Sequence, residues 1–181
     1  MRIISGNYKK KHIYPPKNFK ARPTTDIAKE GLFNIIVNNF DIENISVLDI
    51  FSGTGSISYE FASRNCKNII SVEINYFNYS FICKTVKELD FSQIKTYKTD
   101  AFKYLKKCNT SFDIIFADPP YNLKNIEDIP LLVFENKLLK KNAWLIIEHS
   151  ENINFNNFDN FLKTRKYGKV NFSFFEQVDN S

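Results

Sequence analysis

The sequence has few of the residues that build metal sites and disulfide frameworks. Its 181 residues include only 3 Cys, 2 His and 5 Gly. The cysteines, Cys66, Cys83 and Cys108, form no C-x-x-C pair, so neither a zinc site nor a disulfide framework is predicted. His12 and His149 are too few and too isolated for a metal site or a Ser-His-Asp arrangement. We therefore expect no metal cofactor.

Long apolar stretches are also missing. None approaches the roughly 20 residues that a bilayer-spanning helix needs, and residues 1–6 contain no apolar core of a signal peptide. We expect a cytoplasmic protein without a membrane partner. Hydrophobic residues make up 43% of the chain, including 18 Phe and 9 Tyr, which favours one folded domain over disorder. A monomer is the plain expectation.

Positive charge is concentrated near the N-terminus of this chain, whose net charge is +5. Basic residues crowd one short stretch that contains no acidic residue: Lys9, Lys10, Lys11, Lys17, Lys20 and Arg22. Such a cluster suits a polyanionic partner such as nucleic acid. Ser5-Gly6-Asn7 predicts a turn between two short strands. We predict a basic hairpin arm over residues 1–23, followed by an α/β body over residues 24–181, within one compact domain overall.

From residue 46 onward, apolar β-branched runs alternate with stretches of helical periodicity. Predicted strands cover residues 46–51, 68–72, 94–97, 112–117 and 143–147. Intervening helices imply parallel pairing with helices on both faces of the sheet. After a short helix around residues 155–162, two strands at 164–167 and 170–176 follow too closely for a helical crossover. The prediction is an α/β fold with a mostly parallel sheet and a C-terminal antiparallel hairpin.

Carboxylates and glycines follow the first two predicted strands, at the edge where open α/β sheets bind ligands. Gly53 and Gly55 come after Asp49 and let the backbone turn tightly beside a ligand. Ser58 replaces the third glycine of a dinucleotide loop, and Asp49 would repel pyrophosphate. The same carboxylate can pair with the cationic amino-acid part of S-adenosylmethionine. Glu73 can accept both hydroxyls of a ribose, in NAD or in S-adenosylmethionine.

Asp100 and Ala101 follow the third predicted strand. The Asp100 carboxylate can accept a hydrogen bond from an adenine amine, and the Ala101 N–H can face a ring nitrogen. Asp100 is at least as well suited to capping the helix that follows. Both roles are compatible if the carboxylate and the amide divide them.

Asp118-Pro119-Pro120-Tyr121, after the fourth predicted strand, is the most specific motif of the chain. Two prolines directly after a buried strand hold the Asp118 carboxylate and a carbonyl in one orientation. Both groups accept hydrogen bonds, and together they can hold an exocyclic amine with its lone pair toward a methyl donor. The Tyr121 ring offers a face on which a base can stack. The motif therefore predicts methyl transfer to a base amine.

Together these motifs resemble a known family. Asp49–Gly55 followed by D-P-P-Y is similar to class I methyltransferases that modify base amines. The segments R-I-I-S-G at 2–6, R-P-T-T-D at 22–26 and L-F-N at 32–34 resemble the bacterial 16S ribosomal RNA guanine-N2 methyltransferases of the RsmD family. The resemblance covers essentially the whole chain in the expected order. Ser58 and Asn65 depart from positions where this family usually has glycine.

The resemblance implies a Rossmann-like class I methyltransferase fold with a seven-stranded sheet, and S-adenosylmethionine as cofactor. It implies that the substrate is guanine N2 in 16S ribosomal RNA, free or within the small ribosomal subunit. The implied catalytic residues are Asp118, Pro119, Pro120 and Tyr121. The implied cofactor contacts are Asp49, Phe51, Gly53, Gly55, Glu73, Ile74, Asp100 and Ala101. The implied RNA contacts are Arg2, Lys9, Lys10, Lys11, Arg22 and Thr24.

Three other interpretations stay open from the sequence. An adenine-N6 methyltransferase on RNA or DNA would share the D-P-P-Y motif and the cofactor site, although the R-P-T-T-D and L-F-N segments favour the guanine family. A nicotinamide-dependent oxidoreductase is disfavoured by Asp49, by the missing third glycine and by the lack of an obvious catalytic Tyr-Lys or His constellation. A non-catalytic RNA-binding assembly module is compatible with the basic arm.

Overall fold

The computed structural model describes residues 1–15 and 25–178. The helices are α1 (Asp26–Val37), α2 (Ser56–Ser63), α3 (Tyr76–Glu88), α4 (Ala101–Lys107) and α5 (Asp128–Glu135), with a 3-10 helix at Ile42–Asn44. The strands are β1 (Ser46–Ile50), β2 (Asn68–Glu73), β3 (Ile94–Lys98), β4 (Phe112–Ala117), β5 (Leu139–His149), β6 (Phe161–Tyr167) and β7 (Val170–Glu176). None of the helices in the described residues has the length and hydropathy needed to span a membrane.

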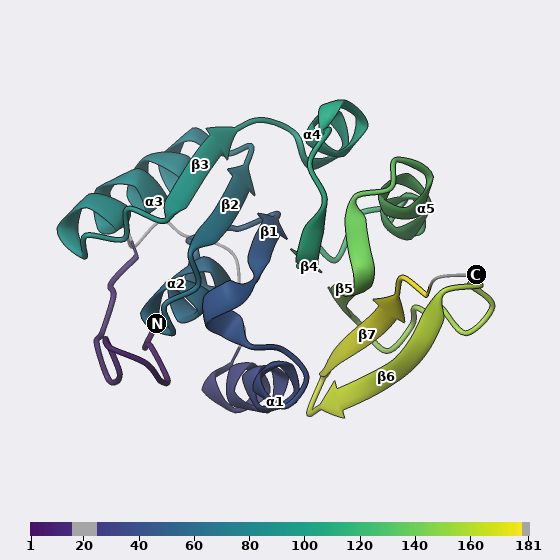
Figure 1. Cartoon of the computed structure of the whole chain (residues 1–181), viewed down its shortest axis with the longest axis horizontal. Helices are drawn as coiled ribbons and strands as arrows, with labels where there is room; N and C mark the ends of the chain where they lie inside the picture. The colour runs from purple at the N-terminus through teal and green to yellow at the C-terminus, as the bar shows by residue number, and fades with distance from the viewer. Residues whose placement is uncertain (16–24, 179–181) are drawn as a thin grey trace.

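The strands form one seven-stranded sheet in the order β3-β2-β1-β4-β5-β7-β6. The first five strands pair in parallel, whereas β7 pairs antiparallel with both β5 and β6. In Figure 1 the arrowheads of β2 and β3 point to the same edge of the sheet. This topology confirms the predicted Rossmann-like class I methyltransferase fold, including its C-terminal antiparallel hairpin.

Alternate residues of the central strands face two separate hydrophobic clusters. On β1, Val47 lies in one cluster and Leu48 in the other, and Ile114 and Ile115 of β4 divide in the same way. The first cluster contains apolar residues of α1, α2 and α3, and the second contains those of α4 and α5. Because the central strands are covered on both faces, ligands are expected at their carboxyl ends.

The N-terminal arm is a hairpin reduced to one antiparallel bridge, between Arg2 and His12. Beside this bridge the Ile3 N–H donates to the Lys11 carbonyl at 2.9 Å. The two short strands expected from the sequence are thus reduced to a single bridge. The chain turns back at Lys10, which has a φ of 70° and whose N–H donates to the Ile3 carbonyl at 2.8 Å.

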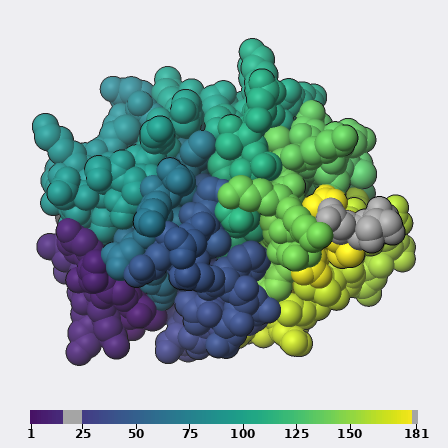
Figure 2. All heavy atoms as spheres, viewed as in Figure 1, coloured from purple at the N-terminus to yellow at the C-terminus, as the bar shows by residue number. Residues whose placement is uncertain are grey.

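The arm packs directly onto the body. Ile3 and Ile13 are buried in the same hydrophobic cluster as α1, α2 and α3. At the tip, Gly6 has a φ of +83°, and a Cβ there would lie 1.9 Å from the Ser63 carbonyl oxygen of α2. Only glycine therefore fits this turn. Figure 2 shows the arm, in purple, in direct contact with the neighbouring body residues.

The predicted helix around residues 155–162 is wrong, since residues 151–160 form turns and irregular backbone instead. The Asn154 side chain accepts a hydrogen bond from the Asn156 N–H at 2.8 Å, which closes a local turn in place of a helical bond. Phe155 and Phe158 pack edge-on against Phe175 of β7. The spacing of these aromatic residues thus reflects a cluster on the sheet and not a helical face.

Candidate active site

A cavity of about 480 Å³ lies at the carboxyl ends of β1, β2, β3 and β4. This volume falls within the range of about 300–1,000 Å³ that is typical of small-molecule sites. The segments predicted separately from the sequence meet there, contributing Asp49, Phe51, Gly53, Glu73, Ile74, Asp100, Ala101, Asp118, Pro119, Pro120 and Tyr121. Gly55 is the one predicted cofactor residue outside this lining.

The loop between β1 and α2 turns through three residues with positive φ. They are Phe51 at 62°, Gly53 at 55° and Gly55 at 84°. For a bulky residue such as Phe51 this conformation costs about 1–2 kcal/mol, and such strain is concentrated at functional sites. A Cβ on Gly55 would lie 2.6 Å from the Tyr59 ring. Gly55 is therefore needed for packing the loop on α2.

Asp49 is a buried carboxylate in the lining of the cavity. The Ser58 hydroxyl donates to Asp49 Oδ2 at 2.6 Å. Burial raises the pKa of Asp49 to about 7, and the hydrogen bonds from Ser58 oppose that rise. Ser58, which stands where the resemblance leads one to expect glycine, thus supports the charged form of Asp49.

Glu73 ties the glycine-containing loop to the end of β2. Its Oε2 accepts the Gly53 N–H at 2.8 Å, and its Oε1 accepts the Asn75 N–H at 2.6 Å. Burial raises the pKa of Glu73, while these backbone donors favour its ionised form. Each carboxylate oxygen can accept one more hydrogen bond, so ribose binding by Glu73 stays a prediction.

Asp100 is placed so that it can both cap α4 and face a ligand in the cavity. Its side chain caps α4 by accepting the Lys103 N–H at 2.9 Å. Asp100 and Ala101 also line the cavity, as does Ile74 at the end of β2. Their contacts with an adenine stay a prediction.

The D-P-P-Y segment leads from the end of β4 along the cavity. The Leu123 N–H donates to the Pro120 carbonyl at 2.8 Å and closes a turn that fixes the segment. Burial and the nearby carboxylates Glu148 and Asp49 raise the pKa of Asp118 well above its ordinary value. Tyr121 also lines the cavity and is 63% exposed. That exposure is what a stacking surface for a base requires.

The cavity has a strongly acidic lining. Asp49, Glu73, Asp100 and Asp118 contribute carboxylates, and its described lining contains no Lys, Arg or His. Such a lining repels the pyrophosphate of a dinucleotide and suits a cationic ligand. Within residues 1–15 and 25–178, no group of three or more His, Cys, Asp or Glu is arranged to hold a metal ion.

Several residues of the site were missed by the sequence analysis. Close neighbours of the predicted residues complete the lining, namely Ser52, Thr54, Ser56, Ile57, Val72, Asn78, Thr99 and Phe116. Glu148 is buried near the end of β5, and the pairing of Ala117 with Ile147 places it at the same register position as Asp118. A carboxylate directly after the apolar run 143–147 is the signal that could have revealed it.

The predicted RNA contacts of the arm lie partly within the described residues. Lys9, Lys10 and Lys11 are exposed. Arg2 forms an ion pair with Asp26 of α1 at 3.0 Å, with both side chains nearly half exposed. Arg22 and Thr24 lie outside the described residues. Binding of RNA by the arm stays a prediction.

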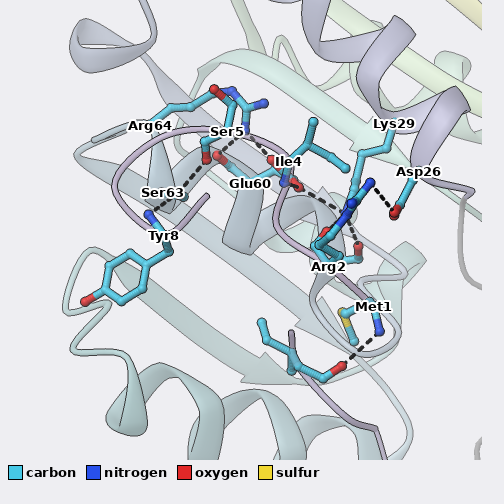
Figure 3. Close-up of polar contacts among 12 residues, drawn as sticks. Met1, Arg2, Ile4, Ser5, Tyr8, Asp26, Lys29, Glu60, Ser63 and Arg64 are labelled. Atoms are coloured by element: carbon cyan, nitrogen blue, oxygen red, sulfur yellow. Dashed lines mark hydrogen bonds and ion pairs between the residues drawn. The ribbon is translucent and has the colours of Figure 1, made fainter. Parts of the chain in front are cut away.

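A charge cluster of buried Lys29 and Glu60 with partly buried Arg64, here called the arm cluster, fastens the arm to α1 and α2 (Figure 3). Lys29 Nζ lies 3.0 Å from Glu60 Oε1, and Arg64 pairs with the same carboxylate. The Ile4 N–H donates to Glu60 Oε1, and Lys29 Nζ donates to the Arg2 carbonyl, both at 2.6 Å. Opposite charges and backbone partners together offset the cost of burying these groups.

Known relatives cover almost the whole chain. Residues 1–176 match a family model described as Conserved hypothetical protein 95. A Buchnera aphidicola (subsp. Baizongia pistaciae) protein named Ribosomal RNA small subunit methyltransferase D is 33% identical, over 99% of this chain and 93% of that protein. The chain belongs to the RsmD family. The Escherichia coli K12 protein of the same name is 27% identical to this RsmD family member, over 82% of this chain and 74% of that protein.

Solved structures share the complete architecture of this RsmD family member. A candidate methyltransferase from Escherichia coli matches it with a TM-score of 0.87 and 25% identity, over 98% of both chains. A candidate methylase from Haemophilus influenzae matches with a TM-score of 0.81 and 27% identity, again over 98% of both chains. The likeness therefore extends beyond the sheet to nearly every described element, and the resemblance drawn from the sequence motifs is confirmed.

Proposed function

We propose that this RsmD family member is an S-adenosylmethionine-dependent methyltransferase acting on the exocyclic N2 amine of a guanine in small-subunit (16S) ribosomal RNA. The acidic cavity carries the proposal, because carboxylates converge there from separate strand ends and no basic residue of the described lining offsets them. S-adenosylmethionine bears positive charge on its sulfonium and its ammonium groups. A cavity of this charge favours it over NAD.

The residues around the glycine-containing loop would hold the cofactor. Asp49 would accept the ammonium group, Glu73 the ribose hydroxyls, and Asp100 with Ala101 the edge of the adenine. When bound, S-adenosylmethionine supplies an activated methyl group on a good leaving group. A cation in the cavity also stabilises the ionised forms of Asp49 and Asp118, whose pKa values are otherwise raised.

Asp118 and the Pro119 carbonyl would hold the target amine, with Tyr121 stacked on the base. An aromatic amine is a poor nucleophile because its lone pair is delocalised, so a fixed orientation toward the methyl group contributes much of the rate. As the N–C bond forms and the C–S bond breaks, the nitrogen must release one proton. The ionised Asp118, with an intrinsically raised pKa, can accept that proton.

Ribosomal RNA is the proposed substrate because relatives at 33% and 27% identity are named as small subunit ribosomal RNA methyltransferases. Guanine is the proposed base because the R-P-T-T-D and L-F-N segments resemble those of the guanine-N2 family. The exposed lysines of the arm suit the RNA backbone. An adenine amine fits two acceptors equally well, so the identity of the base is the point to test. A stacked and paired base cannot enter the cavity, so the target must be flipped out or already unpaired.

A methyl-transfer assay tests this function. The purified protein is incubated with labelled S-adenosylmethionine and small ribosomal subunits from a strain that lacks the endogenous activity, and the RNA is digested to nucleosides. We expect the label in N2-methylguanosine. Label in N6-methyladenosine would overturn the proposed base, and no label in subunits, free RNA or DNA would overturn the proposed reaction.

A further inference from the structure

Two large aromatic side chains are exposed at the start of α3, beside the cavity. Tyr76 is 59% exposed and Phe77 is 75% exposed, and their ring centroids are 5.9 Å apart. Adjacent apolar rings in solvent add little to the core of a folded protein. Exposed apolar groups gathered in this way are typical of binding surfaces.

Hydrogen bonds fix the backbone that carries these rings. The Asn75 side chain caps α3 by accepting the N–H groups of Phe77 at 2.9 Å and of Asn78 at 3.2 Å. The Asn75 N–H itself donates to Glu73, which also holds the glycine-containing loop. The rings are therefore mounted on the same hydrogen-bonded frame as the cavity. A backbone held in this way loses little conformational entropy on binding.

A lysine from the neighbouring strand completes the group. Lys98 is exposed at the end of β3, and its ammonium lies 5.2 Å from the centroid of the Tyr76 ring. The register of β2 and β3 sets Lys98 opposite Glu73, at the sheet edge where both arrowheads end in Figure 1. Flat rings beside an exposed cation match the stacked bases and the phosphates of a single-stranded nucleic acid.

We propose that Tyr76, Phe77 and Lys98 form a second base-stacking site, the flanking-base site, which binds an unpaired nucleotide of the RNA strand that also carries the target base. The inference rests on the proposed function. Ile74, Asn78 and Thr99, the close sequence neighbours of these residues, line the cavity. β2 lies two strand spacings from β4, or roughly 10 Å, so one RNA strand can reach both Tyr121 and the flanking-base site.

Binding titrations separate stacking from simple apolar contact. The probe is a short, fluorescently labelled single-stranded RNA oligonucleotide containing guanine. We expect Phe77→Leu to weaken its binding about tenfold, because leucine keeps the apolar volume and removes the ring face. Phe77→Tyr keeps a ring and should bind within about twofold of the wild type. Equal binding by Phe77→Leu and the wild type, or equal losses in both variants, would overturn the site.

The salt dependence of binding tests the lysine. Lys98→Gln should lower the slope of log K against log salt by about 0.7, the value for one phosphate contact on a single strand. Lys163→Gln is the matched control, because Lys163 also lies over aromatic rings, 5.2 Å from the centroid of Trp144, but on β6 at the opposite edge of the sheet. An unchanged slope in Lys98→Gln, or the same change in both variants, would contradict the assignment.

Cofactor binding distinguishes this site from the cavity. Phe77→Leu should leave the affinity for S-adenosylmethionine within about twofold of the wild type, since stacking serves the RNA. A loss confined to cofactor affinity would place Phe77 in the cofactor site and overturn the inference. The RNA titration does not depend on methyl transfer. A wild-type protein that binds RNA through Phe77 but transfers no methyl group would therefore contradict only the proposed function.

Discussion

Two groups of charged residues in this molecule differ in how far their charges are compensated by residues of opposite sign. In the arm cluster, the Glu60 carboxylate is paired with both Lys29 and Arg64. In the cavity, Asp49 and Asp118 lie among other carboxylates, with no basic residue in the described lining. Burial without a basic partner raises the pKa values of Asp49 and Asp118. The first group is neutralised within the fold, whereas the second has no basic partner in the described lining and suits a cationic ligand.

The difference separates structural from functional charge. A compensated buried cluster holds its elements in place, and the arm cluster joins the arm, α1 and α2. Uncompensated carboxylates cost stability and persist in proteins where a ligand or a reaction uses them. Changes in the arm cluster should therefore affect mainly folding, and changes in the cavity should affect mainly binding and chemistry.

Asp118→Ala is expected to have the largest effect, on activity alone. Removing an acceptor that orients the amine should lower the rate of methyl transfer at least about a hundredfold. The melting temperature should not fall, since a carboxylate buried at a cost to stability is removed. The exposed Glu135→Ala serves as a control for loss of one negative charge. An active Asp118→Ala enzyme would contradict the role given to Asp118.

Glu60→Gln should affect stability. Removing the negative charge of the arm cluster leaves the buried Lys29 and the partly buried Arg64 uncompensated, which costs about 3–5 kcal/mol in the free energy of unfolding. Urea denaturation measures this loss. Glu151→Gln is the matched control, because Glu151 pairs with Lys166 on the exposed surface and its loss should leave the denaturation midpoint unchanged. Similar midpoints for the two variants would remove the contrast between the two buried groups.

The pH dependence of stability should reveal the raised pKa of Asp49. Folded Asp49 keeps its proton up to about pH 7, whereas an unfolded aspartate releases it near pH 4. The folded state therefore loses stability as the pH rises through this window. The free energy of unfolding of Asp49→Asn minus that of the wild type should therefore be larger at pH 8 than at pH 5, by on the order of a few kcal/mol. A difference between the two proteins that does not vary with pH would contradict this account.

Ser58→Ala should have a smaller effect, on cofactor affinity. The Ser58 hydroxyl donates to Asp49 at 2.6 Å and favours its ionised form. Without this donor, a larger fraction of Asp49 is protonated at neutral pH, and S-adenosylmethionine should bind several-fold more weakly. Calorimetric titration at pH 7 and at pH 9 checks the reason as well as the size, because the loss should shrink at the higher pH.

Much of the fold and the site could be predicted because both depend on local patterns. Strand-end residues such as Asp49, Glu73 and Asp118 follow apolar runs, and parallel pairing brings all carboxyl ends to one edge. The error around residues 155–162 arose because Phe155 and Phe158 have a helix-like spacing, while their packing partner Phe175 is far away in the sequence.

The arm cluster could not be predicted for the same reason. Lys29 and Glu60 are 31 positions apart on two different helices, and nothing in the sequence of either helix indicates that these charges are buried together. Glu148 was missed although it directly follows an apolar run near the end of β5. Its neighbour across the sheet, Asp118, is known only once the register of β4 and β5 is known. Contacts between charged residues that are far apart in the sequence could thus be found only from the structure.

The most direct test of the central claim is a calorimetric titration of the purified protein with S-adenosylmethionine and, separately, with NADH. The account predicts that S-adenosylmethionine binds and NADH does not. It also predicts that the affinity for S-adenosylmethionine falls as the pH drops below about 7, where Asp49 becomes protonated, and that Asp49→Asn binds weakly at every pH. Binding of NADH, or affinity for S-adenosylmethionine that is independent of both pH and Asp49, would contradict a cavity built for a cationic cofactor.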